Sequence, residues 1–366
     1  MKRPYLVNFA AISADDNISV KASVTDSNTP LIEKREGKKS APTSPIQSIG
    51  LISSDEYRIK IEGFGARQQK IYNREFDSDR FGIFDLKLPR TIAGEEIEKL
   101  QVYETSYRPG LELLMGSYLP YKIKKPKKII ISDFDKTLVD TKYSTALEMY
   151  QSLRRPLNYF PTVEKSVELF AEYSSRGFQP FILSASPHFY ENAIRDWLYQ
   201  NKFYAGNIFL KDYRNIFSFT DGLLTPKDLK RQSFYKLNQL VNILIMTGIP
   251  EELVLMGDSF ESDEDIYLVL ASILVSKNDP WKVWNAIKKE RSFRLTTKQN
   301  FHFLSKFYQL GEMGRSAQVK NLKIHIRCNE KNYRRTIKNA EEHSGPKAAP
   351  FDFIQDEKDL VNYYLG

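Results

Sequence analysis

The chain has 366 residues, of which 41% are hydrophobic and 27% are charged, and its formal net charge is +8. This composition is typical of a globular protein with about two domains and excludes a largely disordered chain. No apolar run approaches the roughly 20 residues of a spanning helix, which excludes a helical membrane protein. The positive charge favours phosphate-bearing partners such as phospholipid surfaces or phosphorylated metabolites, and no strong nucleic-acid signal accompanies it. The single cysteine, Cys328, excludes an internal disulfide and is expected to be a small buried residue.

The first 12 residues contain two basic residues and a short apolar patch that Asn8 interrupts. This pattern is a weak secretory signal. We therefore expect a cytoplasmic protein whose contact with membranes, where it occurs, is peripheral.

The first 120 residues have the patterns of β structure. Two strands are expected at residues 5–12 and 18–24, followed by a flexible linker from Thr25 to Gln47 that is rich in Ser, Thr, Pro and Lys. Period-two alternation at residues 57–61 and 81–88 predicts antiparallel strands. We predict N-terminal strands and a linker over residues 1–49 and a small β-sandwich domain over residues 50–120.

From residue 121 onward, apolar strands alternate with helices, which predicts an α/β domain over residues 121–366 with a doubly wound parallel sheet. Ser186 is expected to be the N-cap and Pro187 the first residue of one of its helices. The pattern predicts a helical insertion at about 271–318. The remaining expected elements are strands at 127–132, 180–183, 207–210, 253–256, 322–328 and 351–354 and helices at 146–153, 162–175, 189–199, 229–246 and 356–365.

Polar residues follow three of these strands. Asp133 and Asp135 come after the first strand, Ser184 after the second, and Asp258 after the fourth. Parallel sheets place their ligands at the carboxyl ends of the strands, so we expect these side chains to meet. One aspartate can attack phosphorus, and a second can protonate the leaving oxygen. Two carboxylates beside a phosphate repel one another, which predicts a divalent cation, and Mg²⁺ fits oxygen ligands.

A phosphoryl oxygen also needs donors and a fixed cation. The hydroxyl of Ser184 and the N-terminus of the helix after Pro187 are expected to supply donors. The cation is expected to come from the segment between the third and fourth strands. Lys230 is the first choice for it and Lys227 the second, while Arg231 remains an alternative.

Two segments carry a resemblance to a known family. Residues 127–270 resemble the phosphohydrolases of the haloacid dehalogenase superfamily, with its four motifs in order. The segments 181–190 and 257–267 are similar to those of the actin-patch type of phosphatidate phosphatase, which is related to lipins. These segments read Phe-Ile-Leu-Ser-Ala-Ser-Pro-His-Phe-Tyr and Gly-Asp-Ser-Phe-Glu-Ser-Asp-Glu-Asp-Ile-Tyr. The sequence departs from that family at two positions. His188 stands where the family has tryptophan, and Phe260 stands where the family has glycine.

The resemblance implies a haloacid dehalogenase-like fold and a role for each matching residue. Asp133 would be the nucleophile and Asp135 the general acid and base. Mg²⁺ would be held by Asp133, Asp258 and the main-chain carbonyl of Asp135, with Asp263 in the outer shell. The implied reaction removes phosphate from phosphatidate and gives diacylglycerol. The residues expected to contact the substrate are Thr137, Ser186, His188 and Lys211.

The spacing of the motifs leaves little chain for a large cap over the site, which favours a bulky substrate or one held at an interface. The basic segment 122–128 either contacts an anionic membrane surface or is simply a solvent-exposed segment that precedes the first strand of the α/β domain. Two alternatives stay open. One is a phosphatase for another large substrate, such as a phosphoprotein or a nucleic-acid end. The other is a phosphatidate-binding module without catalysis.

Overall fold

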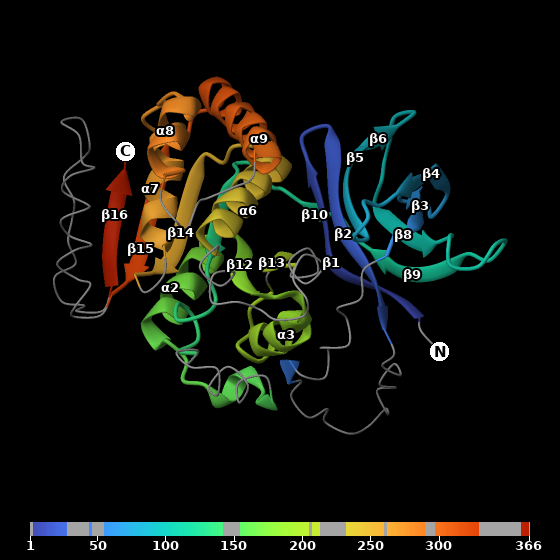
Figure 1. Ribbon diagram of the computed structural model, residues 1–366, viewed down its shortest axis with the longest axis horizontal. Coiled ribbons are helices and arrows are strands. Elements are labelled where there is room, and N and C mark those ends of the chain that lie inside the picture. Colours follow the sequence, from blue (N-terminus) through green and yellow to red (C-terminus); the bar gives the residue numbers. More distant parts are fainter. Residues whose placement is uncertain are drawn as a thin grey trace.

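The chain folds into a β part within residues 3–122 and an α/β part within residues 128–365 (Figure 1). The computed structural model describes residues 3–27, 44–45, 55–141, 154–204, 207–212, 232–259, 262–289, 297–328 and 360–365. The predicted helix at 146–153, the predicted strand at 351–354 and most of the predicted linker lie outside these residues.

The β part contains two four-stranded sheets and one short hairpin. The first sheet has the order β10-β1-β2-β5 and the second the order β4-β3-β8-β9. Buried side chains of both sheets, among them Val20, Ile59 and Val102, form one hydrophobic core. The strands are β1 (Arg3–Ala14), β2 (Asn17–Ser27), β3 (Arg58–Phe64), β4 (Lys70–Asp77), β5 (Ile83–Pro89), β6 (Thr91–Ile92), β7 (Glu95–Glu96), β8 (Lys99–Glu104), β9 (Leu113–Tyr118) and β10 (Tyr121–Lys122).

The N-terminal strands are integrated more closely than predicted. β2 pairs with β5 from Asn17↔Pro89 to Ser23↔Ile83, so both N-terminal strands share a sheet with residues beyond 50. The predicted boundary at residue 50 therefore divides one sheet. β2 also extends to Ser27, two residues into the predicted linker. Local patterns identified the strands, but the pairing joins residues 60 to 72 positions apart in the chain, which no local pattern reveals.

The α/β part is built on a six-stranded sheet with the order β13-β12-β11-β14-β15-β16. The first five strands are parallel, and β16 is antiparallel to β15. β11 thus lies in the interior of the sheet, between two strands that follow it in the chain. The strands are β11 (Lys128–Ser132), β12 (Gln179–Pro187), β13 (Asn207–Lys211), β14 (Glu252–Asp258), β15 (Asn321–Arg327) and β16 (Leu360–Leu365).

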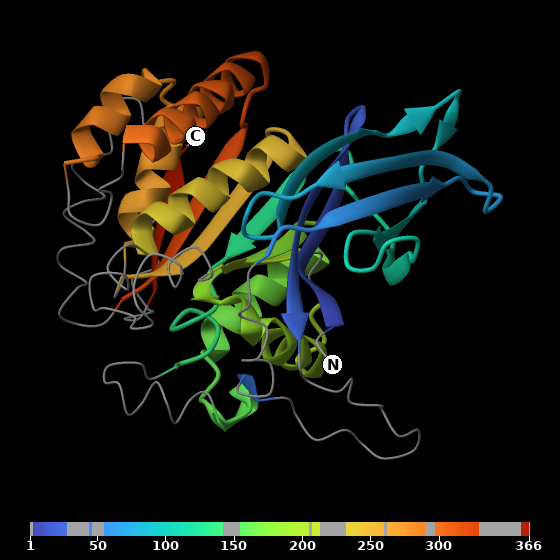
Figure 2. The ribbon, with the colours of Figure 1, turned by 45° about the vertical axis from the view of Figure 1, so that its right-hand side comes forward.

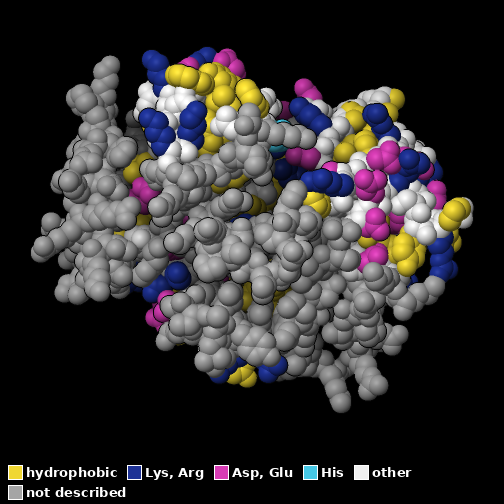
Figure 3. Space-filling model, in the orientation of Figure 1, with side chains coloured by type: hydrophobic (Ala, Val, Ile, Leu, Met, Phe, Trp, Pro, Cys, Tyr) yellow, Lys and Arg dark blue, Asp and Glu magenta, His cyan; other side chains and the backbone are white. Residues whose placement is uncertain are grey.

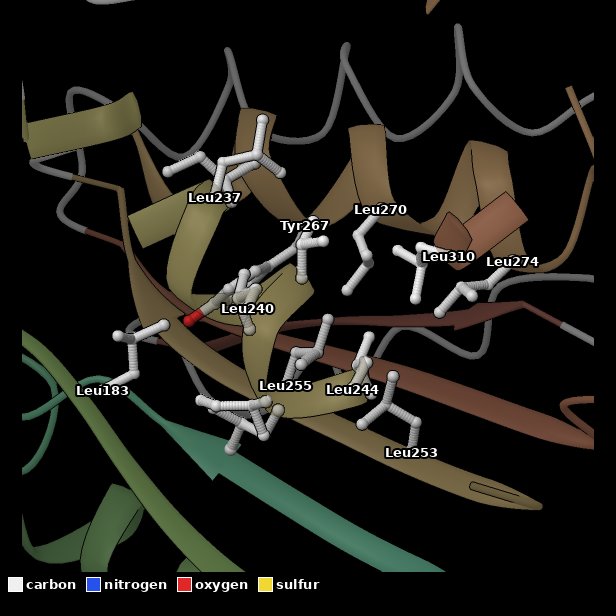
Figure 4. Packing of buried hydrophobic residues seen from close by; sticks show 14 of the residues in the cluster. Leu183, Leu237, Leu240, Leu244, Leu253, Leu255, Tyr267, Leu270, Leu274 and Leu310 are labelled. Atoms are coloured by element: carbon white, nitrogen blue, oxygen red, sulfur yellow. The ribbon is translucent and has the colours of Figure 1, made fainter. Parts of the chain in front are cut away.

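Helices cover both faces of this sheet. The helical elements are η2 (Leu157–Tyr159), α2 (Glu164–Ser175), η3 (His188–Tyr190), α3 (Glu191–Gln200), α6 (Gln232–Thr247), α7 (Asp263–Leu274), α8 (Pro280–Ile287) and α9 (Thr297–Ser316). Alternate residues of β11 enter different cores: Ile131 joins the core of α6 and α7, and Ile130 joins that of α2 and α3. Figure 4 shows Leu244 of α6 close to Leu253 and Leu255 of β14, with Leu240 near Leu255. A strand buried on both faces explains the continuous apolar run of the sequence.

Three local predictions are wrong. The strand β12 continues through Pro187, and α3 begins at Glu191, so Ser186 is not a helix N-cap. Within the predicted helix at 356–365, residues 360–365 form β16, because they pair along β15 from Leu322↔Leu365 to Arg327↔Leu360. The first residues of the predicted insertion, 271–274, belong to α7.

Within the rest of the predicted insertion, residues 280–287 and 297–316 form the helices α8 and α9. Trp284 of α8 and Phe303 and Phe307 of α9 are buried against α6 and α7. On the outer side, Trp281 and Phe301 are 53% and 68% exposed, and Lys282 and Lys289 are also exposed. Figure 3 shows hydrophobic and basic side chains together over α8 and α9. No helix among the described residues is long and apolar enough to cross a membrane.

The two parts of the chain share a hydrophobic core and an ionic contact. Ala10 and Ile12 of β1 belong to the core formed by α6 and the six-stranded sheet, and β1 lies beside β13 and α6 (Figures 1 and 2). Asp85 of β5 lies 3.3 Å from the Nζ atom of Lys21 and 3.7 Å from that of Lys306 on α9. Burial lowers the pKa of Lys21 to about 8, against the opposing effect of Asp85.

The low pKa of Lys21 predicts a pH-dependent stability. The unfolded chain keeps this proton up to about pH 10.5, whereas the folded protein loses it near pH 8. The unfolded state therefore binds more protons between these values, and the folded state gains stability as the pH rises. We expect the unfolding free energy of the wild type to rise by up to about 3 kcal/mol relative to Lys21→Met over this range. Urea unfolding of both proteins at pH 7.5 and pH 10.5 measures this difference. An equal change in unfolding free energy for the wild type and Lys21→Met would contradict the prediction.

Candidate active site

Three neighbouring strands bring their polar ends together at one edge of the sheet. Asp133 directly follows β11, Ser184 lies near the end of β12, and Asp258 ends β14. The register places Ser132 beside both Ile182 and Met256. The backbone N–H of Asp133 donates to the carbonyl of Met256 at 2.8 Å, which ties the residue after β11 to β14.

Asp133, Asp258 and Asp263 form a buried cluster of carboxylates. One oxygen from each lies within 4.8 Å of the others, and each side chain is almost completely buried. Asp263 begins α7, and its Oδ2 atom accepts the backbone N–H of Asp258 at 3.3 Å. Gly257 permits this approach, since a Cβ atom there would lie 2.6 Å from the Cβ of Asp263.

A lysine that the sequence analysis missed lies against this cluster. The Nζ atom of Lys236 on α6 is 2.6 Å from Oδ1 of Asp263 and 3.3 Å from Oδ1 of Asp133. Lys236 lies one helical turn before Leu240 of the core, and it is 2% exposed. A lysine at a core-facing helical position was the signal in the sequence. The predicted Lys230, Lys227 and Arg231 lie outside the described residues.

Asp135 has a separate set of partners from Asp133. Its Oδ2 atom accepts the hydroxyls of Ser184 at 2.8 Å and Ser186 at 2.6 Å, and Oδ1 accepts that of Thr141 at 3.0 Å. Ser184, which was expected to donate to a phosphoryl oxygen, here positions Asp135. Because hydroxyl groups can donate or accept, the same partners can hold Asp135 in either protonation state.

The loop after β11 is held in a tight turn that includes Lys136, whose φ is +60°. Thr137 lies within this loop and donates its hydroxyl to Oδ2 of Asp133 at 3.3 Å. Arg327, at the end of β15, donates from Nη1 to the carbonyl of Lys136 at 2.7 Å and to Oδ1 of Asp140 at 3.2 Å. Its own carbonyl accepts the N–H of Ser259 at 2.9 Å, so Arg327 links the loop to the residue after Asp258.

Two of the residues predicted to contact the substrate lie at the next strand end. Lys211 ends β13 opposite Pro187, and both Lys211 and His188 are buried. The Nδ1 atom of His188 lies 3.8 Å from Oδ1 of Asp212. Of the four residues predicted to contact the substrate, Thr137 therefore bonds to Asp133 and Ser186 bonds to Asp135. His188 and Lys211 lie where the adjacent strands β12 and β13 end.

The donor set at the cluster suits a divalent cation. Among the described residues, three buried carboxylates converge beside one buried lysine, and clustered carboxylate oxygens are the ligands that hard divalent ions prefer. Burial, followed by the charge of Asp263, raises the pKa of Tyr267 well above its usual value, so this phenol adds no charge. Its hydroxyl donates to the carbonyl of Met256 at 2.9 Å. Asp133, Asp258 and Asp263 could therefore hold a hard, oxygen-seeking ion.

The cluster predicts that Lys236→Met destabilises the protein. The substitution removes the ammonium group that pairs with Asp263 and Asp133, and breaking a buried pair costs about 3 kcal/mol or more. Urea unfolding in the presence of a chelator measures this loss. Adding Asp263→Asn to Lys236→Met removes the charge of the carboxylate that pairs most closely with Lys236, and it should recover part of the lost stability. A Lys236→Met protein as stable as the wild type would contradict the charge balance described here.

Comparison with solved structures gives only weak likenesses. A β-glucuronidase of Parabacteroides merdae has a TM-score of 0.25 and 6% identity, over 69% of this chain and 34% of that one. A calcium-binding mutant of Bacteroides uniformis β-glucuronidase 2 has a TM-score of 0.20 and 9% identity, over 72% of this chain and 35% of that one. The chain thus spans about a third of the length of these structures, and such scores support no argument about its fold. No curated protein matches the chain.

A protein-family model matches the part of the chain that carries the site. The family is described as the catalytic domain of the phosphatidate phosphatase APP1, and the match covers residues 128–275. These residues run from the start of β11 to the end of α7 and include Asp133, Asp135, Ser184, Lys236, Asp258 and Asp263. The match confirms the resemblance of residues 128–275 to the catalytic domain of this type of phosphatidate phosphatase.

Proposed function

We propose that the chain is a Mg²⁺-dependent phosphatase that converts phosphatidate to diacylglycerol through an aspartyl-phosphate on Asp133. We also propose that its six-stranded sheet with helices on both faces is a doubly wound, haloacid dehalogenase-like fold. One observation carries the proposal: Asp133 lies in a cluster with two carboxylates and a lysine, while Asp135, two residues on, is held apart from it by three hydroxyls.

In the first step, a carboxylate oxygen of Asp133 attacks the phosphorus atom of the monoester. The bond between phosphorus and the lipid oxygen breaks, and Asp135 in its acid form gives its proton to that oxygen. Diacylglycerol leaves, and the phosphoryl group remains on Asp133. The bond from Thr137 fixes the other oxygen of Asp133, so the attacking oxygen is oriented.

In the second step, water hydrolyses the aspartyl-phosphate. Asp135, now a carboxylate, takes a proton from the water as its oxygen attacks phosphorus, and the bond to the Asp133 oxygen breaks. Phosphate is released, and both aspartates return to their initial states. Lys236 lies 3.3 Å from Asp133, close enough to stabilise negative charge on a phosphoryl group attached there.

Bound Mg²⁺ would offset the repulsion between the phosphate and the carboxylates. Asp133, Asp258 and the main-chain carbonyl of Asp135 are the proposed ligands. Asp263 accepts the N–H of Asp258 and pairs with Lys236, which suits a residue that orients a ligand from the outer shell. The buried positions of these side chains keep their geometry fixed during the reaction.

The proposed substrate rests on the family match and on the outer surface of α8 and α9. The matching family acts on phosphatidate, as its description states. Exposed Trp281 and Phe301 beside Lys282 and Lys289 provide the aromatic and basic groups that favour an anionic lipid surface. This combination supports a peripheral contact with membranes by a cytoplasmic protein.

The decisive experiment compares two substrates and two variants. Purified protein is incubated with Mg²⁺ and either phosphatidate in detergent micelles or a chromogenic aryl phosphate, and released phosphate is measured. We expect both substrates to be hydrolysed, and removal of Mg²⁺ by a chelator to abolish the activity reversibly. Asp133→Asn should lower the rate by about 10³-fold or more, because the amide is not a nucleophile. Asp77→Asn, at an exposed aspartate of β4, is the matched control.

Each other outcome points to a different function. Release from the aryl phosphate alone would exclude the lipid assignment and favour another bulky substrate. If phosphate is released from neither substrate, the phosphatase proposal is wrong and the alternative is a phosphatidate-binding module without catalysis. Full activity of Asp133→Asn would assign the nucleophile to another residue.

Arg327 is expected to position the nucleophile loop. Arg327→Ala removes the bonds to Lys136 and Asp140, and a small displacement of the loop should lower kcat by about 10²-fold with little change in KM. Added guanidinium ion should restore part of the rate, and Arg327→Lys should retain more activity than Arg327→Ala. An equal fall in activity and in stability, without guanidinium rescue, would indicate a merely structural role.

A further inference from the structure

Two serines join the helices that carry Lys236 and Asp263. Ser233 lies in the first turn of α6, Ser262 directly precedes α7, and their hydroxyl groups form a hydrogen bond with each other. Ser233 is 3% exposed, and Ser262 is half-buried. The mechanism described above uses neither serine, so this bond between α6 and α7 has no assigned role.

The position of Ser262 would ordinarily give its side chain a different partner. Ser262 is the N-cap residue of α7, where a serine hydroxyl usually accepts a backbone N–H from the first turn of its own helix. Its side chain makes no such capping bond, and the hydroxyl bonds to Ser233 of α6 instead. The side chain of Ser262 therefore links two helices and does not cap one.

An ion pair joins the same two helices next to this bond. The Nζ atom of Lys236 on α6 lies 2.6 Å from Oδ1 of Asp263, the first residue of α7. Ser233 precedes Lys236 by three residues, so the two side chains are neighbours on the helix surface. Ser262 directly precedes Asp263 in the chain. Because the two bonds lie side by side, the serine pair restricts the movement of Lys236 relative to Asp263.

Asp263 extends this restraint to the proposed metal site. Its Oδ2 atom accepts the backbone N–H of Asp258 at 3.3 Å, while its Oδ1 atom pairs with Lys236. Asp258 is a proposed ligand of Mg²⁺, so a shift of Asp263 would change the orientation of that ligand. Substitution of a residue that orients a metal ligand typically lowers metal affinity by about 10- to 100-fold. A contact that holds such a residue in place should have a smaller effect of the same sign.

We propose that Ser233 and Ser262 are positioning residues that raise the Mg²⁺ affinity of the site by fixing the Lys236–Asp263 pair. The proposal rests on the Mg²⁺-dependent function proposed above and adds two residues that act through Asp263. It assigns a role in metal binding to the contact between α6 and α7.

The first test measures Mg²⁺ binding without catalysis. Mg²⁺ is titrated into the full chain by calorimetry in the absence of substrate. We expect Ser233→Ala and Ser262→Ala each to bind Mg²⁺ about fivefold more weakly than the wild type, the effect of losing one hydrogen bond. The double variant should bind no more weakly than either single variant, because both substitutions remove the same bond.

A matched control comes from the same helix. Ser272 of α7 donates its hydroxyl to the carbonyl of Val269 within its own helix, at 2.7 Å. Ser272→Ala should therefore bind Mg²⁺ like the wild type. Ser262→Thr, which keeps a hydroxyl group at the N-cap position, should restore most of the affinity that Ser262→Ala loses.

The second test measures phosphatase activity against Mg²⁺ concentration. Both single alanine variants should need about fivefold more Mg²⁺ for half of the maximal rate. Their kcat at saturating Mg²⁺ and their KM for phosphatidate should change less than twofold, because the reacting groups are intact. A merely structural role would lower the melting temperature and leave the Mg²⁺ dependence unchanged.

The outcomes separate this proposal from the proposed function. Weaker Mg²⁺ binding by the single variants of a chain without phosphatase activity would retain the positioning role and overturn the function. Equal Mg²⁺ binding by the wild type and the single variants would overturn the positioning role even in an active phosphatase. Additive losses in the double variant would also overturn it, since the two serines would then act separately. A wild type that binds no Mg²⁺ would overturn both proposals.

Discussion

The structure depends on a buried group of like charges that the fold must hold together. Asp133, Asp258 and Asp263 come from three different elements, and Lys236 from a fourth. Such a group is unfavourable unless each charge is compensated and each position is fixed. The interior position of β11 meets this requirement, because strands on both sides hold the residue that follows it. The core of α6 and α7 then fixes the lysine and the outer aspartate.

Most of the strands of the α/β part, and the aspartates that follow two of them, could be predicted from sequence. A buried parallel strand appears in the sequence as a short apolar run. A carboxylate directly after such a run is therefore easy to identify. Asp133, Asp135 and Asp258 were named as candidates in this way. Lys236 was missed because three basic residues lie nearer the start of its helix, and its own position looks like a core position. Arg327 was missed for another reason: its partner is a backbone carbonyl 191 residues earlier in the chain.

The errors in the fold have a common physical origin. Pro187 resembles a helix start in sequence, yet β12 continues through it, since a proline at the end of a strand need not donate to its neighbour. The residues of β16 have a pattern that is compatible with both helix and strand, and pairing with β15 decides between them. In both cases a contact with a distant segment overrides a weak local preference. The N-terminal strands illustrate the same effect on a larger scale.

The place of β1 has a consequence for the folding of the chain. This strand belongs to a sheet of the β part, yet Ala10 and Ile12 complete the core beneath α6. The segment that matches the phosphatase family begins only at residue 128, so on its own it would expose the apolar surface that β1 covers. The two parts therefore share one hydrophobic core, and we expect them to unfold together. A change in the first dozen residues can then reach the catalytic sheet through packing alone, without any contact with the reacting atoms.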